Sequence, residues 1–266
     1  MIVATRLLRD RRRSMLWWAL GVLVLVAFTA ALYPSIRNEA GFDEVIKGLP
    51  ESMKVIVGYD PNVPVTSPAG YLHGRLFALL APLVMLVFAI SAGSDAIGGA
   101  EEAGILEPLL AHPVTRTRVY VERYAANLAM LTALVGLFAL TVIVVAGPVG
   151  ALEGIELTRL AGGCAAMLVL AHVHGAVAFA VGAFTGRRGP AVAVAAALAI
   201  AGYLAQSIVA LSPSLRWLRF LTPWHAYLDR NTLVYGASAA AFVIPLIAIA
   251  GAVTLGHWVF VRRDLR

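Results

Sequence analysis

One short stretch, EEAGILEPLLAHPVTRTR from Glu101 to Arg118, concentrates the residue types that could do chemistry or bind a partner. It combines three glutamates, a glycine, paired leucines and two prolines between long apolar runs. Glutamate side chains are costly in lipid, so the stretch is expected outside the hydrocarbon region. The sequence therefore predicts a compact polar connection at one membrane surface.

Within this connection Glu107 comes directly before Pro108, and proline is favoured at the first position of a helix. We therefore expect a short helix to begin there, with Glu107 near the positive end of its dipole. Leu109 and Leu110 would give the helix an apolar edge, and Pro113 would end it. Such a helix offers leucine anchors to a soluble partner with a matching groove, whereas the simpler interpretation is a tight cytoplasmic loop.

Two histidines and a glutamine stand inside otherwise apolar runs, where polar groups are often functional. His172 and His174 are two residues apart, so on a regular helix they point about 200° away from each other and cannot bind one metal ion. We interpret His172, His174 and Gln206 either as residues of a translocation path or as partners in hydrogen bonds between helices. No metal site, cofactor site or catalytic group is predicted in this chain.

Three further features narrow the chemistry. Cys164 is the only cysteine, so neither an intramolecular disulfide nor a cysteine-based metal site can form. The sequence G-x-x-x-x-G-K-[ST] does not occur, so the chain lacks that phosphate-binding loop and cannot hydrolyse ATP by that route. Asp95, near the end of an apolar run, is expected to be solvated in the connection that follows.

The composition is typical of an integral membrane protein. Hydrophobic residues make up 60% of the 266 residues, charged residues make up 14%, and the mean hydropathy is +0.83. Soluble domains are roughly half apolar and a quarter charged. The net charge is +6, but the arginines cluster at the edges of apolar runs. That distribution indicates contact with anionic lipid head groups and argues against nucleic acid as a partner.

Six apolar runs are long enough to span a membrane: residues 15–33, 76–95, 124–147, 160–184, 190–211 and 238–261. We therefore predict an all-α integral membrane protein with a single domain over residues 1–266. Placing both termini in the cytoplasm puts about 13 of the 21 basic residues there, which the positive-inside rule favours. These residues are Arg6, Arg9, Arg11, Arg12, Arg13, Arg116, Arg118, Arg123, Arg187, Arg188, Arg262, Arg263 and Arg266.

The segments outside the spans carry further expectations. Residues 1–13 suit an amphipathic helix in the head-group region, with a frayed basic tail as the alternative. Residues 34–74 form a proline-punctuated external loop, and residues 98–118 form a cytoplasmic connection. Before the sixth span, Trp217 and Trp224 alternate with arginines, so we expect an interfacial or re-entrant segment there.

The stretch from Glu101 to Arg116 resembles the signature of ABC-2 type permeases, which runs from acids through Gly-Thr-Leu-Glu and Leu-Leu to Pro and Arg between spans two and three. Ile105 departs from the usual threonine. The six-span layout and the basic amphipathic N-terminus also match, so the resemblance covers most of the chain. The matching residues are Glu101, Glu102, Gly104, Leu106, Glu107, Leu109, Leu110, Pro113, Thr115 and Arg116.

The resemblance implies a permease subunit of an ATP-binding cassette exporter. Residues 98–118 would then be a coupling segment that sits in a cleft of a separate ATPase subunit, and that partner would bind the ATP and Mg²⁺. Two permease halves, identical copies or paralogues, would enclose the transport path. Abundant alanine and the excess of arginine over lysine are typical of a GC-rich genome, which favours the plasma membrane of a bacterium.

Two other classes of function stay open. An ion-gradient carrier would need polar groups at mid-membrane and paired broken helices; Pro82 interrupts the second span without an evident counterpart in the other half. An intramembrane protease of the Glu-Glu-x-x-x-Arg type is less favoured, because Leu106 stands where that pattern needs arginine. The residues do not indicate a substrate.

Overall fold

The computed structural model describes residues 2–50, 53–54, 59–211, 217 and 222–264 of the chain. Within those ranges the regular structure is helical and contains no strand. Three of the segments, η1 to η3, are π-helical. The elements are α1 (Ile2–Asp10), α2 (Arg12–Ile36), α3 (Ala40–Lys47), α5 (Pro68–Leu72), η1 (His73–Leu80), α6 (Ala81–Ser94), η2 (Asp95–Gly99), α7 (Ala100–Glu102), α8 (Leu106–Leu110), α9 (Arg116–Thr141), η3 (Val142–Ala146), α10 (Leu157–Thr185), α11 (Arg188–Leu211), α12 (Pro223–Leu228), α13 (Thr232–Tyr235) and α14 (Ala240–Arg262).

Six helical segments are long and apolar enough to span a membrane, which confirms the predicted number. The second of them is continuous from α5 through η1, α6 and η2 to α7. The chain is therefore a multi-pass membrane protein. The six segments are Arg12–Ile36, Pro68–Glu102, Arg116–Ala146, Leu157–Thr185, Arg188–Gln206 and Ala240–Arg262.

The connection between the first two spans is shorter than predicted, because the helices on both sides of it extend into residues 34–74. Pro34 lies inside α2 rather than in the loop. The second span begins at Pro68 rather than near residue 76. Ser67 caps it, since its hydroxyl accepts a hydrogen bond from the N–H of Gly70 at 3.2 Å. Hydropathy missed this turn because a cap depends on hydrogen bonding and not on apolar character.

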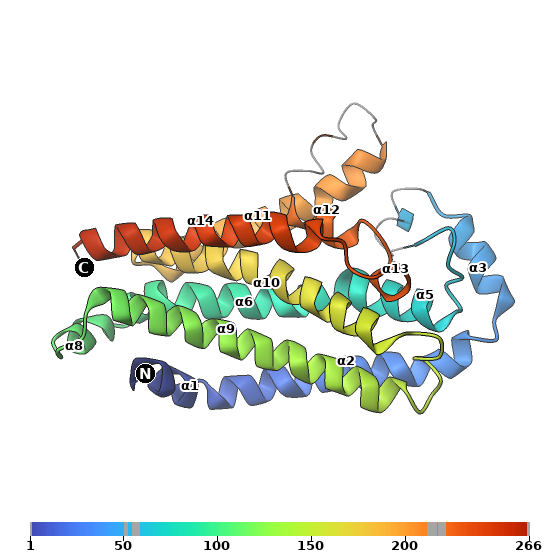
Figure 1. Cartoon of the computed structure of the whole chain (residues 1–266), viewed down its shortest axis with the longest axis horizontal. Coiled ribbons are helices and arrows are strands. Elements are labelled where there is room, and N and C mark those ends of the chain that lie inside the picture. Colours follow the sequence, from blue (N-terminus) through green and yellow to red (C-terminus); the bar gives the residue numbers. More distant parts are fainter. Residues whose placement is uncertain (1, 51–52, 55–58, 212–216, 218–221, 265–266) are drawn as a thin grey trace.

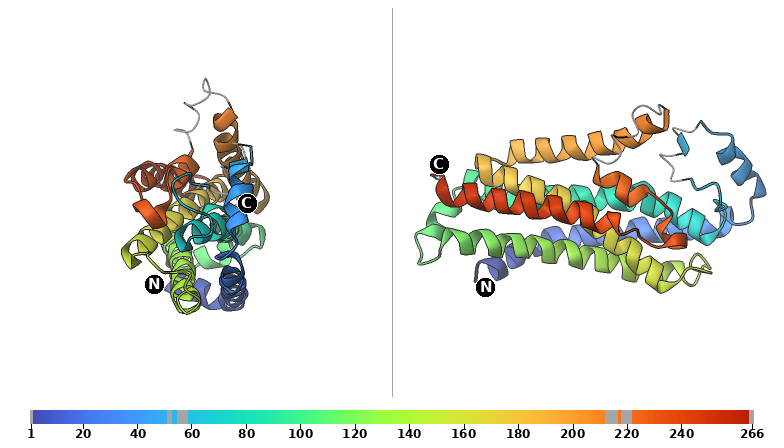
Figure 2. Two further views of the ribbon diagram at one scale, coloured as in Figure 1. Left: turned by 90° about the vertical axis from the view of Figure 1, so that its right-hand side faces the viewer. Right: turned by 45° about the horizontal axis from the view of Figure 1, so that its top comes forward.

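The spans form one bundle in which α6 and α10 are central (Figures 1 and 2). In the most apolar 18-residue stretch of each span, 67% is buried for the spans of α6 and α10, against 22% for α2 and 17% for α11. In both figures α2 lies on the opposite side of the bundle from α11 and α14. The outer helices therefore present apolar side chains away from the bundle, as lipid contact requires.

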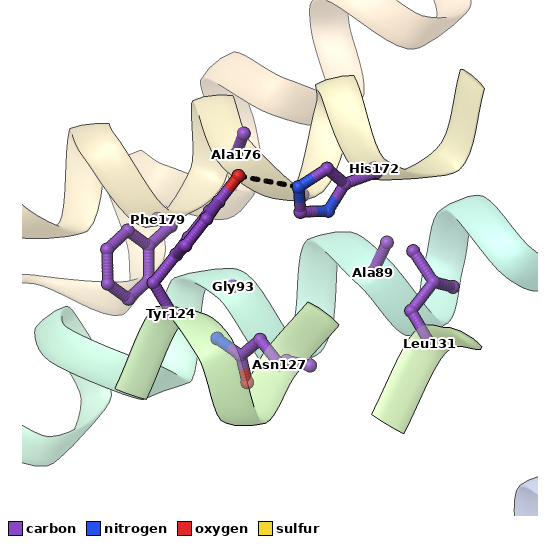
Figure 3. Close-up of a pocket in the computed structure, with 10 residues that line it drawn as sticks. Ala89, Gly93, Tyr124, Asn127, Leu131, His172, Ala176 and Phe179 are labelled. Atoms are coloured by element: carbon purple, nitrogen blue, oxygen red, sulfur yellow. Dashed lines mark hydrogen bonds between the residues drawn. The ribbon is translucent and has the colours of Figure 1, made fainter. Parts of the chain in front are cut away.

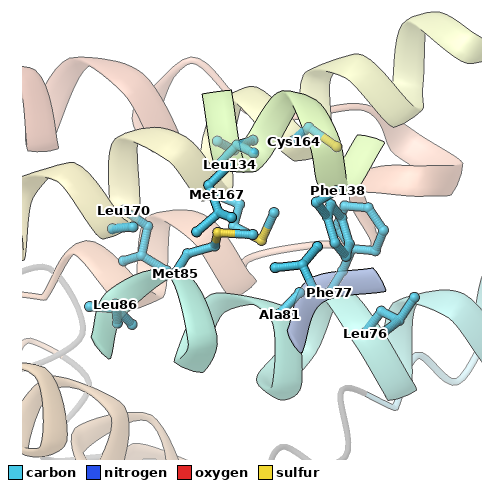
Figure 4. Packing of buried hydrophobic residues seen from close by; sticks show 14 of the residues in the cluster. Leu76, Phe77, Ala81, Met85, Leu86, Leu134, Phe138, Cys164, Met167 and Leu170 are labelled. Carbon is cyan, nitrogen blue, oxygen red and sulfur yellow. The ribbon is translucent and has the colours of Figure 1, made fainter. Parts of the chain in front are cut away.

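The core between these helices is filled by aromatic and sulfur-containing side chains (Figure 4). The rings of Phe77 and Phe138 pack edge to face at 5.5 Å, and Met85 and Met167 lie beside them. Cys164 is buried in the same cluster as a free thiol. Its role is therefore that of a small apolar side chain.

A glycine contact brings the two central helices together. A methyl group added at Gly93 would lie 2.3 Å from the backbone oxygen of Gly175, so the α6 and α10 backbones touch at this point. Small residues permit such an approach in membranes, where van der Waals contact takes over the role of the hydrophobic effect. Many small residues line both helices, and only the packed structure shows which of them meet.

The two ends of the bundle differ in content. Both termini and α8 lie at one end, which we call the α8 end, and α3 and α13 lie at the other, which we call the α3 end (Figure 1). At the α8 end the first residues form a helix, because the N–H groups of Val3 and Ala4 donate to the Glu122 carboxylate at 3.0 and 3.1 Å. Val3 is buried while Arg6 and Arg9 are exposed. The predicted amphipathic helix is therefore present, and the frayed tail is not.

The predicted interfacial segment before the sixth span falls partly on residues 212–216 and 218–221, which include Phe220 and lie outside the described residues. Trp217 is exposed, in agreement with an interfacial position. Trp224 is buried, in contrast to the prediction. Its ring packs against Tyr203 at 5.0 Å, and its Nε1–H donates to the carbonyl of Ala199 at 3.0 Å. The indole N–H thus donates to a buried carbonyl on α11, whereas we expected it to donate to lipid head groups.

Candidate functional site

The coupling segment forms two short helices joined by a glycine turn. The helix α7 ends at Glu102, Gly104 adopts a positive φ of 65°, and α8 begins at Leu106. The predicted start at Pro108 was therefore two residues late, which the geometry permits because the first turn of a helix needs no backbone donors. Thr115 then caps α9, since its hydroxyl accepts from the N–H of Arg118 at 3.2 Å.

The leucines of α8 face the protein itself. Leu106 is fully buried, and Leu109 and Leu110 are half-buried against a cluster that includes Tyr120. The projecting apolar tip expected from Leu109 and Leu110 is therefore only partly available. Ile105, at 54% exposure, is the large apolar side chain that the segment turns outward. Glu102, Glu107 and Pro113 are exposed around it.

Glu101 is buried in an ion pair that the sequence did not reveal. The guanidinium of Arg263 donates from Nη1 to Oε1 of Glu101 at 2.8 Å and from Nη2 to Oε2, which makes a two-pronged contact. The Glu101 side chain is 4% exposed. The Nε of Arg263 also donates to the carbonyl of Ala183 at 2.7 Å. One arginine thus ties the coupling segment to the ends of α14 and α10.

Two more contacts complete this junction, which we call the Glu101 clasp. Arg116, the first residue of α9, donates from Nη1 to the carbonyl of Arg263, and the same nitrogen lies 3.4 Å from the carbonyl of Phe260. Gly186 ends α10 with a positive φ of 67°, and a methyl group there would lie 2.6 Å from Oε1 of Glu101. The segment is therefore fastened to α9, α10 and α14 at once.

Asp95 is less solvated than predicted, at 24% side-chain exposure, because the helix continues past it to Glu102. Its carboxylate forms an ion pair with Arg11, and Arg188 lies 3.7 Å away. Burial, with the nearby Arg188 charge, lowers the pKa of Arg11 from its ordinary value. These contacts join the residue before the first span to the second and fifth spans.

The three polar residues singled out in the sequence all make hydrogen bonds, and that of His172 is drawn in Figure 3. Nε2 of His172 lies 2.6 Å from the Tyr124 hydroxyl on α9. Nδ1 of His174 lies 2.9 Å from the carbonyl of Leu170 in its own helix. The amide of Gln206 donates to the Thr222 hydroxyl at 3.3 Å. In the part of the chain that the structure describes, no group of His, Cys, Asp or Glu side chains is arranged to hold a metal ion.

The cavity beside His172 is small. It lies between α6, α9 and α10, is lined by Gly93, Tyr124, Asn127 and Phe179 among others, and has a volume of about 10 Å³. That is room for about one water molecule. The cavity therefore has no room for a larger solute in this conformation.

The sequence indicated the coupling segment but not the side chains that it contacts. Arg263 was counted only as a cytoplasmic charge, and its contact with Glu101 joins residues 162 positions apart. A carboxylate next to lipid needs a cation, which is a signal that a partner exists. Nothing in the sequence indicates which of the many arginines provides it.

Comparisons with known proteins give the family of the chain. The model of a family described as "ABC-2 family transporter protein" matches residues 1–265. No curated protein matches the chain.

Proposed function

Because this chain belongs to the ABC-2 transporter family, we propose that it is the membrane-spanning half of an exporter driven by a separate ATPase subunit. The family match makes the chain a transport component of an ABC transporter in general. The drive by ATP hydrolysis in a partner, the outward direction and the parts played by individual residues are the proposal. ATP and Mg²⁺ would bind to the ATPase subunit.

The Glu101 clasp is the observation that carries the proposal. A partner that moves the coupling segment must move span ends with it, because Arg263 and Arg116 fasten the segment to three of them. A loosely attached loop would absorb the displacement instead. The clasp therefore supports a role in transmitting the ATPase movement to the membrane helices.

The exposed face of the coupling segment supplies a contact surface for that ATPase. Ile105 provides an apolar anchor, with Glu102 and Glu107 on either side of it in the sequence. A short helix with one apolar anchor and flanking charges suits a cleft lined by apolar and basic groups. Leu109 and Leu110 would support the segment from beneath.

The position of the basic residues supports a cytoplasmic α8 end. Both termini and α8 lie there, and the predicted cytoplasmic arginines on α1, α9 and the last turn of α14 lie at the same end. The positive-inside rule then favours a cytoplasmic location for this end. The plasma membrane of a prokaryote is the compartment that the composition favours.

A second permease half would complete the path. The cavity near His172 is too small for a solute, and α2, α11 and α14 expose most of their apolar stretches. A path between two copies or paralogues, with lipid covering the remaining apolar surface, accounts for both observations. His172, His174 and Gln206 would then influence the path through helix packing.

The test is to purify the tagged chain from its native membrane and to measure the ABC ATPase that copurifies with it. We expect Ile105→Asp and Glu107→Lys to reduce the recovered ATPase at least about tenfold, since loss of an interface anchor typically costs more than 1.4 kcal/mol. Glu39→Lys makes the same charge change at an exposed site at the α3 end and should have no effect. Undiminished ATPase recovery in both variants would refute the coupling role, and transport that continues without any ATPase would favour a gradient-driven carrier.

A further inference from the structure

A large cavity lies at the α8 end, beside the exposed face of the coupling segment, and Ile105 lies at the border between the two. Its volume is about 590 Å³, which is within the range of small-molecule sites. Its walls come from α1, η2, the coupling segment and α9. This cavity is much larger than the one beside His172.

Arg123 gives the cavity a buried positive charge. It lines the cavity at 6% exposure, and its Nη1 donates to the carbonyl of Ala96. Among the described residues its Nε has no hydrogen-bond partner, and no carboxylate forms an ion pair with it. An unpaired buried guanidinium is costly, and proteins usually pair such a group with an anion.

The other charges around the cavity do not neutralise Arg123. Arg6 and Arg11 also line it, against the carboxylates of Asp10 and Asp95. Asp95 is already shared between Arg11 and Arg188. Cationic groups therefore exceed carboxylates there, and the cavity attracts an anion.

The depth and the remaining walls indicate what kind of anion fits. Arg123 is seven residues into α9, which places it about 10 Å from the start of that helix. That is near the boundary between the head groups and the hydrocarbon. Val3, Leu7 and Leu109 add apolar surface beside the guanidinium groups. A ligand with a phosphate group attached to an apolar body matches both kinds of wall.

We propose that this cavity binds the phosphate group of an anionic phospholipid, with Arg123 and Arg6 as its ligands. Arg123 would hold the phosphate from within through hydrogen bonds in the fork geometry that suits phosphate. Arg6, which is exposed on α1, would hold it from the mouth. A bound lipid would thereby fasten α1 to α9. This site does not depend on the proposed ATPase, and its test needs none.

The test is native mass spectrometry of the delipidated full-length chain in detergent, titrated with phosphatidylglycerol or with phosphatidylcholine of the same acyl chains. We expect a roughly tenfold preference for phosphatidylglycerol. Arg123→Gln should abolish the preference. Arg6→Gln should weaken phosphatidylglycerol binding about fivefold, since one basic residue near anionic lipid contributes about 1 kcal/mol.

Arg9→Gln is the matched control, because Arg9 is exposed on the same helix and is not among the residues that line the cavity. Non-specific attraction would weaken phosphatidylglycerol binding equally in the Arg6→Gln and Arg9→Gln variants. That result would overturn the site even if Arg123→Gln fails to fold. Equal binding of the two lipids would also overturn it. If inorganic phosphate competes for the cavity as strongly as phosphatidylglycerol does, the ligand is not a lipid, and the cavity is assigned to a soluble phosphate compound.

Discussion

The two ends of the bundle are held together by different interactions. At the α8 end, ion pairs join residues that are far apart in the sequence, such as Arg263 with Glu101 and Arg11 with Asp95. Among the described residues, the long-range contacts at the α3 end are hydrogen bonds instead. Arg159 donates to the carbonyl of Val234, the N–H of Val65 donates to the Asp43 carboxylate at 2.7 Å, and two neutral tyrosines donate to carbonyls. The hydroxyl of Tyr71 donates to the carbonyl of Thr29 at 2.7 Å. The Tyr227 hydroxyl donates to the carbonyl of Phe77 at 2.7 Å.

Within the described ranges, the ion pairs at the α3 end are local by contrast. Arg159 pairs with Glu156 and Arg230 pairs with Asp229, so these pairs hold no distant segments together. A neutral hydrogen bond to a backbone carbonyl is specific but modest in energy, whereas a buried ion pair is very sensitive to the loss of one partner. The comparison teaches that the α8 end is the one whose assembly a charged partner can influence.

The largest effect should come from removing the arginine of the Glu101 clasp. Arg263→Met leaves the buried Glu101 carboxylate without its guanidinium and should lower the free energy of unfolding by about 3 kcal/mol. Denaturant titration of the protein in detergent measures this loss. Arg262→Met is the control, because Arg262 is exposed and stacks on the Trp258 ring at 4.1 Å, a contact that contributes about 0.5–1 kcal/mol.

The double variant Glu101→Leu with Arg263→Met sharpens this result. It removes both charges and should recover part of the stability lost in Arg263→Met. Equal losses in Arg263→Met and Arg262→Met would contradict the difference between the two ends, because the clasp would then contribute no more than an exposed contact.

A smaller effect should follow from substituting the glycine beside the clasp. Gly186→Ala forces alanine into a left-handed conformation, which costs roughly 1–2 kcal/mol, and also crowds the Glu101 carboxylate. Gly154 at the α3 end also has a positive φ, but no atom lies near its added methyl group. Gly154→Ala should therefore show the cost of the left-handed conformation alone. Thermal unfolding in detergent compares the two, and a loss in Gly154→Ala as large as in Gly186→Ala would show that the clasp tolerates the methyl group.

The smallest effect should come from the α3 end. Tyr71→Phe removes one neutral hydrogen bond and should lower the free energy of unfolding by about 1 kcal/mol. Tyr235→Phe, at an exposed tyrosine of the same end, should change it by no more than about 0.5 kcal/mol. The same denaturant titration measures both variants. Should Tyr71→Phe prove as damaging as Arg263→Met, neutral and charged contacts would have to be regarded as equivalent here.

The sequence by itself determined the class of protein, the six spans and the place of the coupling segment. Lipid imposes these features locally, because each span must be apolar along its own length and each arginine must reach a membrane surface. The free Cys164 and the opposed directions of His172 and His174 followed from equally local rules. Errors in the spans were confined to their ends, where Ser67 and Thr115 cap helices through hydrogen bonds.

Only the tertiary structure decided which groups meet. It paired Glu101 with Arg263, brought Asp95 to Arg11, buried Trp224 and turned the leucines of α8 toward the protein. Each of these contacts joins segments that are distant in the chain and close in the bundle, so no spacing rule predicts them. The physical reason is that a buried charge or indole requires a partner, while the packing of helices selects which partner is within reach.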